Sequence, residues 1–269
     1  MTSSESFQTI GLEVDAESGV AVLTLDRPDE ANAINAQMAA ELRRASLMLA
    51  RDGSVRAVLL RSFGRVFCGG GDLAAFAAEP RDAVSAYIES LTIDLHAALA
   101  RFAKMDAPVV AAVSGSAGGA GMSLVAACDL VLAGASAKFT MGYTKAGLIP
   151  DGTSSFFLAR TVGLRRATEL VLTNRVLSAA EAEAWGLVNQ VVPDATVREE
   201  AMALARTLAA GPTRAFGLAK RVLCEGAASS LEEAMERESR YIAVAADMDD
   251  AYEGITAFVA KRPAQFHGS

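Results

Sequence analysis

The sequence predicts an α/β fold with a helical C-terminal region. Short apolar stretches alternate with longer amphipathic ones in the first half of the chain. Two glycine-rich turns each follow an apolar stretch and precede a helical one. From about Ser178 onward the hydrophobic pattern is almost purely helical. Strands that lead into helices through glycine turns are typical of α/β cores.

The first elements have clear boundaries. The stretch Val20–Leu25 (VAVLTL) predicts a strand, which Asp26-Arg27-Pro28 ends. Apolar residues at helical spacing predict a helix over Ala36–Arg51, with Asn35 as its N-cap. In chain order the pattern then predicts strand Val55–Leu60, helix Ala83–Lys104, strand Val109–Val113, helix Met122–Ala127 and strand Asp129–Ala133.

The last third of the chain predicts helices alone. We therefore expect an α/β core over residues 1–195 and a helical region over residues 196–269. The predicted helices of the last third are Ala179–Trp185, Thr196–Ala210, Pro212–Cys224, Leu231–Ala246 and Met248–Ala260.

Composition excludes several classes of function. The net charge is −7 and no run of Lys or Arg forms a basic stripe, which disfavours a nucleic-acid partner. Three cysteines without CxxC spacing and two histidines make a metal site improbable, and suggest reduced thiols. No apolar stretch is long enough to span a membrane, and the N-terminus lacks a signal-peptide pattern. We therefore expect a cytoplasmic protein without a metal.

The two glycine turns, Phe67–Leu73 and Ser114–Gly121, are candidates for binding negative charge. Free N–H groups at a helix N-terminus attract negative charge, and glycine lets the backbone approach a ligand closely. Two such turns facing each other could each direct one N–H at a single oxygen. Such an oxyanion hole stabilises a transition state by roughly 2.7–4 kcal/mol per donor. Either turn taken alone favours the simpler interpretation, a tight strand-to-helix reversal, and neither matches a Rossmann, P-loop or nucleophile-elbow motif.

Taken together, these turns and several further motifs resemble the crotonase (enoyl-CoA hydratase/isomerase) superfamily. The resemblance covers nearly the whole chain in the right order. The matching segments are Arg27-Pro28, Asn32–Asn35, Phe67–Leu73, Pro108–Gly115, Ala117–Gly121, Ala127–Ala133, Gly147–Pro150, Leu177–Ala182, Trp185–Val188 and Phe258–Pro263.

The resemblance implies a crotonase-like spiral of ββα units and a helical C-terminal region that forms homotrimers or hexamers. It implies an acyl-CoA substrate, with coenzyme A as part of the substrate and no separately bound cofactor. The oxyanion donors would be the N–H groups of Gly71 and Ala120. The resemblance places coenzyme A along Asn32, Ala33, Ile34, Cys68, Gly69, Phe258 and Lys261, the last two often supplied by a neighbouring subunit.

The carboxylates of the family separate its reactions. The hydratases hold a water between two glutamates, and counting along the motifs puts those positions on Ser123 and Tyr143. Hydroxyl groups cannot replace a carboxylate pair near neutral pH. One acid stands nearby: Asp151 occupies the Pro-Asp-Gly position that serves as acid/base in isomerases of the family. Asp151 is also a plausible N-cap of a helix that begins near Thr153.

His96 is a second candidate for the chemistry. It matches the histidine base of the chlorobenzoyl-CoA dehalogenases of this family, whose nucleophilic aspartate matches Asp151. However, Gly71 and Tyr143 stand where those enzymes have a phenylalanine and a tryptophan, and a lone histidine on a helix is more often a packing or surface residue.

The first hypothesis is therefore an acyl-CoA isomerase, in which Ser123 and Tyr143 shape the acyl pocket. A hydratase, a dehalogenase-like enzyme and a non-catalytic CoA-binding scaffold are the alternatives.

Overall fold

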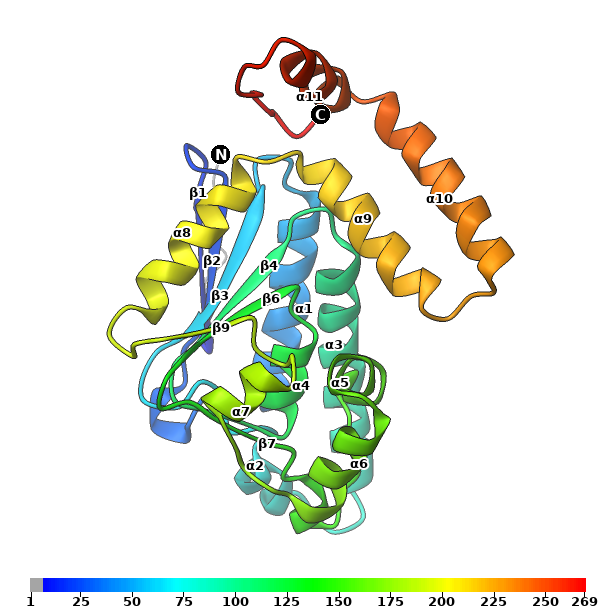
Figure 1. The fold of residues 1–269 in the computed structure, drawn as a ribbon. Coiled ribbons are helices and arrows are strands. Elements are labelled where there is room, and N and C mark those ends of the chain that lie inside the picture. Colours follow the sequence, from blue (N-terminus) through cyan, green and yellow to red (C-terminus); the bar gives the residue numbers. More distant parts are fainter. Residues whose placement is uncertain (1–6) are drawn as a thin grey trace.

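The computed structural model describes residues 7–269 of the chain (Figure 1). A six-stranded sheet, in the order β1-β2-β3-β4-β6-β9, forms the centre of the molecule. Only β1 pairs antiparallel, and each of the other neighbours pairs parallel. Its strands are β1 (Ile10–Asp15), β2 (Val20–Leu25), β3 (Ala57–Ser62), β4 (Val109–Val113), β6 (Leu130–Gly134) and β9 (Gln190–Val192).

Helices cover both faces of this sheet, which explains why β2 and β4 are buried at every position and apolar at all but Thr24. On one face, α1 (Ala36–Arg51) and α3 (Val84–Lys104) pack together against the sheet. On the other face, α8 (Val197–Ala209) buries its alanines against residues of β2, β3, β4 and β6. The predicted N-cap of α1 is confirmed, since the Asn35 side chain accepts from the N–H of Met38 at 2.9 Å.

A second, three-stranded sheet lies beside the first and carries the site described below. It consists of β5 (Ser116–Gly118), β7 (Lys138–Thr140) and β8 (Leu177–Ser178). Around it lie five helices and a 3-10 segment. These are α2 (Leu73–Ala78), α4 (Ala120–Ala126), α5 (Ser154–Val162), α6 (Leu164–Thr173), α7 (Ala179–Ala184) and Tyr143–Ala146.

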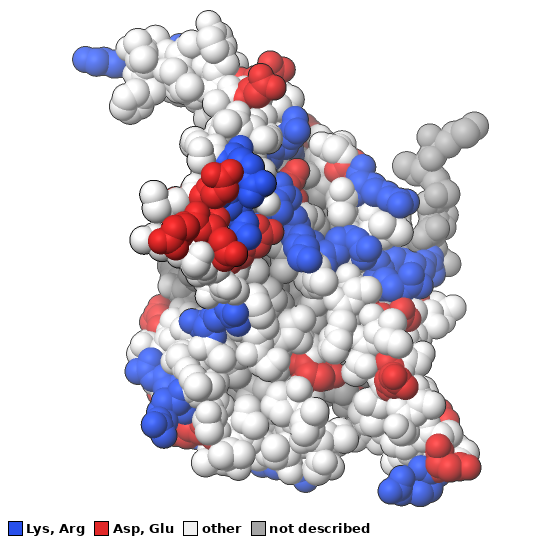
Figure 2. Space-filling view, turned by 90° about the vertical axis from the view of Figure 1, so that its right-hand side faces the viewer, with Lys and Arg blue, Asp and Glu red and all other residues white. Residues whose placement is uncertain are grey.

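The last helices leave the body of the molecule. The helix α9 (Thr213–Gly226) is attached to it by an ion pair between Lys220 and Asp129 at 2.7 Å. We call α10 (Leu231–Ala246) and α11 (Asp249–Val259) the C-terminal arm, because they project from α9 in Figure 1. None of the residues of α10 is buried. Acidic and basic side chains stand next to one another in the upper part of Figure 2, where the arm lies.

The predicted α/β fold with a helical C-terminal region is confirmed. Five strands were not expected, and four of them are only two or three residues long, too short for a hydrophobic period. One of these, β9, interrupts the region for which helices alone were predicted. The division of the chain after residue 195 stays a prediction, and α8, which follows it, packs on the sheet.

Residues 1–6, which belong to the N-terminal stretch without a signal-peptide pattern, lie outside the described residues. Within residues 7–269, no helix combines the length and the apolar character that a membrane crossing needs.

Candidate active site

The two glycine turns lie against each other through their backbones. The N–H of Cys68 donates to the carbonyl of Ser116 at 3.2 Å, and the N–H of Gly118 donates to the carbonyl of Cys68 at 2.9 Å. A Cβ on Gly121 would lie 2.3 Å from the Cys68 carbonyl oxygen, and one on Gly70 would lie 2.9 Å from the Gly118 oxygen. Glycine is therefore required at both positions because the backbone of one turn packs on the other.

Within residues 7–269, each turn contains an N–H group for which the protein offers no acceptor. The neighbours of Gly71 pair with Ile34, which accepts from Asp72 at 3.0 Å and donates to Gly70 at 2.7 Å. Ala120 is the first residue of α4, where backbone N–H groups have no partner within the helix. Among the residues that the structure describes, neither the Gly71 nor the Ala120 N–H donates to protein, and both residues line one cavity. The predicted pair of oxyanion donors is thus brought to the same space.

An ion pair ties the first turn to the segment before α1. Asp72 caps α2 by accepting from the N–H of Ala75 at 3.0 Å, and it pairs with Arg27 at 3.0 Å. Burial by itself raises the pKa of Asp72, but the Ala75 N–H and Arg27 outweigh burial and hold the pKa below its ordinary value. Arg27 also donates to the carbonyl of Ala33. Both contacts of the Asp72 carboxylate are structural, so this group is not free to act as an acid or base.

The cavity between these turns and the segment 142–155 has a volume of about 670 Å³. Its walls are mostly apolar. Among the described residues that line it, Asp151 is the single carboxylate and His96 the single histidine. Large apolar side chains from α2, α3 and the loop before Asp151 form the rest of the wall: Leu73, Phe76, Ile88, Leu91, Leu148 and Ile149.

Three oxygens from distant parts of the chain meet at one side of this cavity. The hydroxyl of Tyr143 donates to Oδ1 of Asp151 at 2.5 Å, and the Ser123 hydroxyl lies 3.0 Å from the Tyr143 oxygen. The one hydroxyl proton of Tyr143 is given to Asp151. The Ser123 hydroxyl also lies 3.3 Å from the carbonyl of Gly119, so the Ser123 proton has two acceptors within reach, Tyr143 and Gly119. The two positions expected to correspond to the glutamates of the hydratases are therefore adjacent, and a hydroxyl occupies each.

Tyr143 is a permanent donor in this arrangement. Burial and the negative charge of Asp151 raise the pKa of Tyr143 above its ordinary value of 10.0, so the hydroxyl keeps its proton at physiological pH. Ser123 is fully buried and does not itself line the cavity; it acts through Tyr143. The expectation that Ser123 shapes the acyl pocket is corrected accordingly.

The alternative in which Asp151 caps the following helix is wrong. Thr153 occupies the N-cap position of α5, and the side chain of Asp151 makes no capping bond. The contact runs instead through the backbone, since the carbonyl of Asp151 accepts from the N–H of Ser154 at 3.1 Å. The carboxylate points to Tyr143 and the cavity.

His96 lies next to the segment that carries Asp151. It projects from α3 into the same cavity, and its Nε2 accepts from the N–H of Gly152 at 3.1 Å. No sequence pattern predicts this contact, because 56 residues separate the two partners.

The residues expected along coenzyme A are only partly brought together. Ile34 and Gly69 line the cavity, and Ala33 is half-buried beside them. The side chain of Asn32 is turned inward and donates to the carbonyls of Phe63 and Val66. Contact of Asn32 with a ligand is thus limited to its backbone.

The side chain of Cys68 likewise points into the core and not into the cavity. Its side chain is fully buried, and burial raises the pKa of the thiol to about 12. A thiol held in this way is neither a nucleophile nor a contact for coenzyme A, and only the Cys68 backbone remains for that role.

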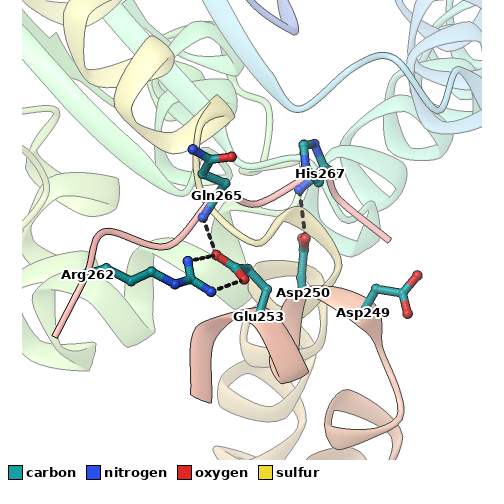
Figure 3. A pocket seen from close by; sticks show the side chains of 6 residues that line it. All are labelled: Asp249, Asp250, Glu253, Arg262, Gln265 and His267. Atoms are coloured by element: carbon teal, nitrogen blue, oxygen red, sulfur yellow. Dashed lines mark hydrogen bonds and ion pairs between the residues drawn. The ribbon is translucent and has the colours of Figure 1, made fainter. Parts of the chain in front are cut away.

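Phe258 and Lys261 do not reach the cavity of their own chain. Phe258 is 85% exposed at the end of α11, on the opposite side of the molecule from α2 and α6 (Figure 1). A small polar pocket of about 330 Å³ lies at this end of the arm (Figure 3). Its groups bond one another: Glu253 pairs with Arg262, and Asp250 accepts from the N–H of His267 at 2.7 Å. These bonds anchor the C-terminal residues to α11.

Comparisons with known proteins identify relatives that are named as acyl-CoA enzymes. Residues 15–269 match the family described as enoyl-CoA hydratase/isomerase. A protein of Escherichia coli K12 named 1,2-epoxyphenylacetyl-CoA isomerase is 39% identical over 252 residues, which are 94% of this chain and 96% of that protein. A protein of Rhodobacter capsulatus named probable enoyl-CoA hydratase is 38% identical over 98% of this chain and 99% of its own length.

Solved structures agree with the sequence matches. The crystal structure of an enoyl-CoA hydratase from Mycobacterium smegmatis superposes with a TM-score of 0.88 and 34% identity, and the match covers 97% of this chain and 99% of that one. The two relatives above are named for different activities, so the matches define a family and not one reaction. Since they extend over almost the whole chain, the protein belongs to the enoyl-CoA hydratase/isomerase family and has the mixed α/β crotonase fold.

Proposed function

We propose that the protein is an acyl-CoA isomerase that uses an oxyanion hole and one aspartate as acid and base. The family acts on CoA thioesters. The observation that carries the proposal is the single carboxylate, Asp151, among the described residues that line the cavity. A Ser123 hydroxyl and a Tyr143 hydroxyl stand where a pair of glutamates would hold water.

The reaction follows from the positions of these groups. The thioester oxygen accepts from the N–H groups of Gly71 and Ala120, which stabilise the negative charge that develops on it. The Asp151 carboxylate removes a proton from one carbon of the acyl group, and the electron pair passes into the enolate. The protonated Asp151 then returns the proton to another carbon, and the double bond moves without addition of water.

The cavity supports a bulky apolar acyl group. Its wall carries Phe76 from α2 and Leu91 from α3, and its volume is about 670 Å³. The name of the Escherichia coli relative refers to an aryl-acetyl thioester. We therefore extend the proposal to acyl groups with an aromatic or other ring, as an isomerase of ring-acyl-CoA or enoyl-CoA substrates.

The test is an incubation with crotonyl-, 3-enoyl- and aryl-acetyl-CoA in deuterated water, followed by mass spectrometry. We expect deuterium uptake or double-bond migration without water addition, and loss of both in Asp151→Asn. Hydration at enzymatic rates would replace the isomerase by the hydratase alternative. Turnover of none of these thioesters would favour the non-catalytic scaffold.

A dehalogenase-like reaction is the second candidate, because Asp151 and His96 line the same cavity. In that reaction the Asp151 carboxylate would attack the ring carbon that bears the halogen; a carbon–oxygen bond forms there, the carbon–halogen bond breaks, and halide leaves behind an aryl ester of Asp151. Intact mass measured during turnover of a halobenzoyl-CoA would reveal the adduct. His96 is less suited to act as its base, since its Nε2 already accepts a hydrogen bond.

We further propose that the helical region after residue 195 assembles the chain into a homotrimer or hexamer. Large apolar side chains are exposed on the C-terminal arm, among them Ile242, Tyr252 and Phe258. In such an assembly Phe258 and Lys261 would contact the coenzyme A of a neighbouring copy. Sedimentation should give three or six times the chain mass of 27.9 kDa, and Phe258→Ala should raise KM more than it changes kcat.

A further inference from the structure

The segment that carries Asp151 has an unusual backbone. Gly152 and Thr153 both have positive φ, at +59° and +67°. Positive φ is unfavourable for a β-branched residue such as threonine, so contacts around this turn must hold it in place. A Cβ on Gly152 would lie 2.9 Å from Cβ of Ser123, which shows how closely the turn packs on α4.

Three hydrogen bonds hold the peptide unit between Asp151 and Gly152. Two are local, since the N–H and the hydroxyl of Ser154 both donate to the carbonyl of Asp151, at 3.1 and 2.8 Å. The third comes from a distant element: the N–H of Gly152 donates to Nε2 of His96 at 3.1 Å. His96 therefore binds the peptide unit directly after the carboxylate-bearing residue.

The direction of this bond fixes the state of the imidazole. A backbone N–H can only donate, so Nε2 of His96 carries its lone pair and the proton resides on Nδ1. While the bond to Gly152 exists, Nε2 is not available to remove a proton from a substrate. His96 thus contacts the catalytic segment in a way that conflicts with the role of general base.

The charged groups near His96 are engaged with partners of their own, which leaves Nε2 of His96 free to accept from Gly152. Across the cavity it faces Asp151 and Tyr143, which are bonded to each other. On its own helix the nearby Asp94 pairs with Arg43 of α1 at 2.7 Å. Farther along, Arg160 of α5 lies over the ring of Phe156. The described helix α2, which also contacts α3, has no charged residue.

We propose that His96 is a positioning residue: by accepting from the N–H of Gly152, it holds the Asp151 carboxylate at the angle needed for proton transfer. The inference rests on the proposed role of Asp151. Misplacing a catalytic group by about 1 Å can cost 10²-fold in rate, so the bond would act on kcat and not on binding.

Two substitutions separate positioning from base catalysis. His96→Leu removes the acceptor, and we expect kcat to fall about 10- to 100-fold while KM stays within about twofold. His96→Gln keeps an acceptor, Oε1, at a similar reach but cannot act as a base. We expect it to retain kcat within about threefold of wild type, since a neutral acceptor is all that Gly152 requires. Ile93→Ala, on the exposed side of the same helix, is the control and should change neither constant.

The outcomes are distinct. If His96→Gln is as impaired as His96→Leu, the imidazole takes part in proton transfer and the inference is overturned. If His96→Leu keeps wild-type kcat, the contact has no role. A readout without turnover is the amide signal of Gly152 in nuclear magnetic resonance, which should shift and exchange faster in His96→Leu but not in His96→Gln. An unchanged signal in His96→Leu would overturn the inference even if the isomerase proposal holds. An Asp151→Asn variant with wild-type turnover would instead overturn the proposed function.

Discussion

The two sides of the cavity are built in different ways. The oxyanion side consists of backbone: two glycine turns bonded to each other, with Cys68 buried between them. The opposite side consists of side chains: Asp151, Tyr143 and His96 come from a loop, a 3-10 segment and a helix. This difference suggests that the two sides have different roles in the proposed reaction. In the proposed mechanism the backbone side would stabilise the enolate of any acyl thioester, whereas the side-chain side would determine where the proton goes.

Packing also distinguishes the two sides. The glycine turns cannot accept even a methyl group at Gly121 without moving the backbone of Cys68. The other side depends on a few hydrogen bonds, so it can be altered one atom at a time without a change in the fold. Substitutions on the side-chain side should therefore change kcat with little loss of stability, and substitutions on the backbone side should affect both.

The largest effect on kcat is expected at Asp151. In Asp151→Asn the amide has the size of the carboxylate but cannot accept a proton, so kcat should fall about 10³- to 10⁴-fold, near the upper end of general acid–base contributions. The melting temperature should stay close to that of wild type. Steady-state kinetics and a thermal melt on the same preparation test both. A loss of folding together with activity would mean that the side-chain side is also structural.

The next effect is expected at Gly121, on the backbone side. In Gly121→Ala the added methyl meets the Cys68 carbonyl, which would move the Ala120 N–H away from the thioester oxygen. The loss of one oxyanion donor lowers kcat about 10²-fold. Gly226→Ala, where no atom lies within 4 Å of the added Cβ, is the matched control and should behave as wild type. Equal behaviour of the two variants would refute the required close approach of the turns.

A smaller effect is expected at Tyr143. Tyr143→Phe removes the hydrogen bond to Asp151, and kcat should fall about tenfold, in line with a bond to a charged group. The pKa of Tyr143 is raised in the fold, so the folded state binds this proton more tightly than the unfolded chain. The free energy of unfolding should therefore decrease as the pH rises above about 10, and less steeply in Tyr143→Phe. Denaturant titrations at pH 8 and pH 11 measure this difference, and identical slopes in both proteins would contradict it.

The smallest effect on activity concerns Cys68. Burial raises the pKa of its thiol to about 12, so an alkylating reagent at pH 8 should leave Cys68 unlabelled in the folded protein and label it after unfolding. Peptide mass spectrometry locates the label. Alkylation of the accessible thiols should leave kcat unchanged. Rapid labelling of Cys68 in the folded protein would show that the backbone side opens readily.

The candidate site residues could be named from sequence because motifs that resemble a known family place them, and the caps could be named because they depend on local rules. Glycine in the turn Phe67–Leu73 marks a backbone constraint, and the segment Pro108–Gly121 fixes the count that leads to Ser123. Asn35 is recognisable as a cap because capping needs only neighbouring residues. The contact between Gly152 and His96 could not be found in this way, since it joins two elements that only the folded chain brings together.

In the C-terminal part, too, some features could be predicted from sequence and others could not. Helical periodicity predicted α10 and α11 nearly to the residue, because amphipathic spacing is a local property. Periodicity does not predict where these helices lie. How they turn away from or toward the core decides that Phe258 lies far from the cavity of its own chain and that α8 covers the sheet.

The sequence by itself determined the α/β fold and the glycine turns, which are encoded in residue types at short spacing, and it determined the family through the resemblance of motifs along nearly the whole chain. The tertiary structure decided that Ser123, Tyr143 and Asp151 form one hydrogen-bonded chain, and that His96 holds the turn beside it. The physical reason is that hydrogen bonds between distant side chains depend on distance and angle. Both are fixed only when the helices and sheets have packed.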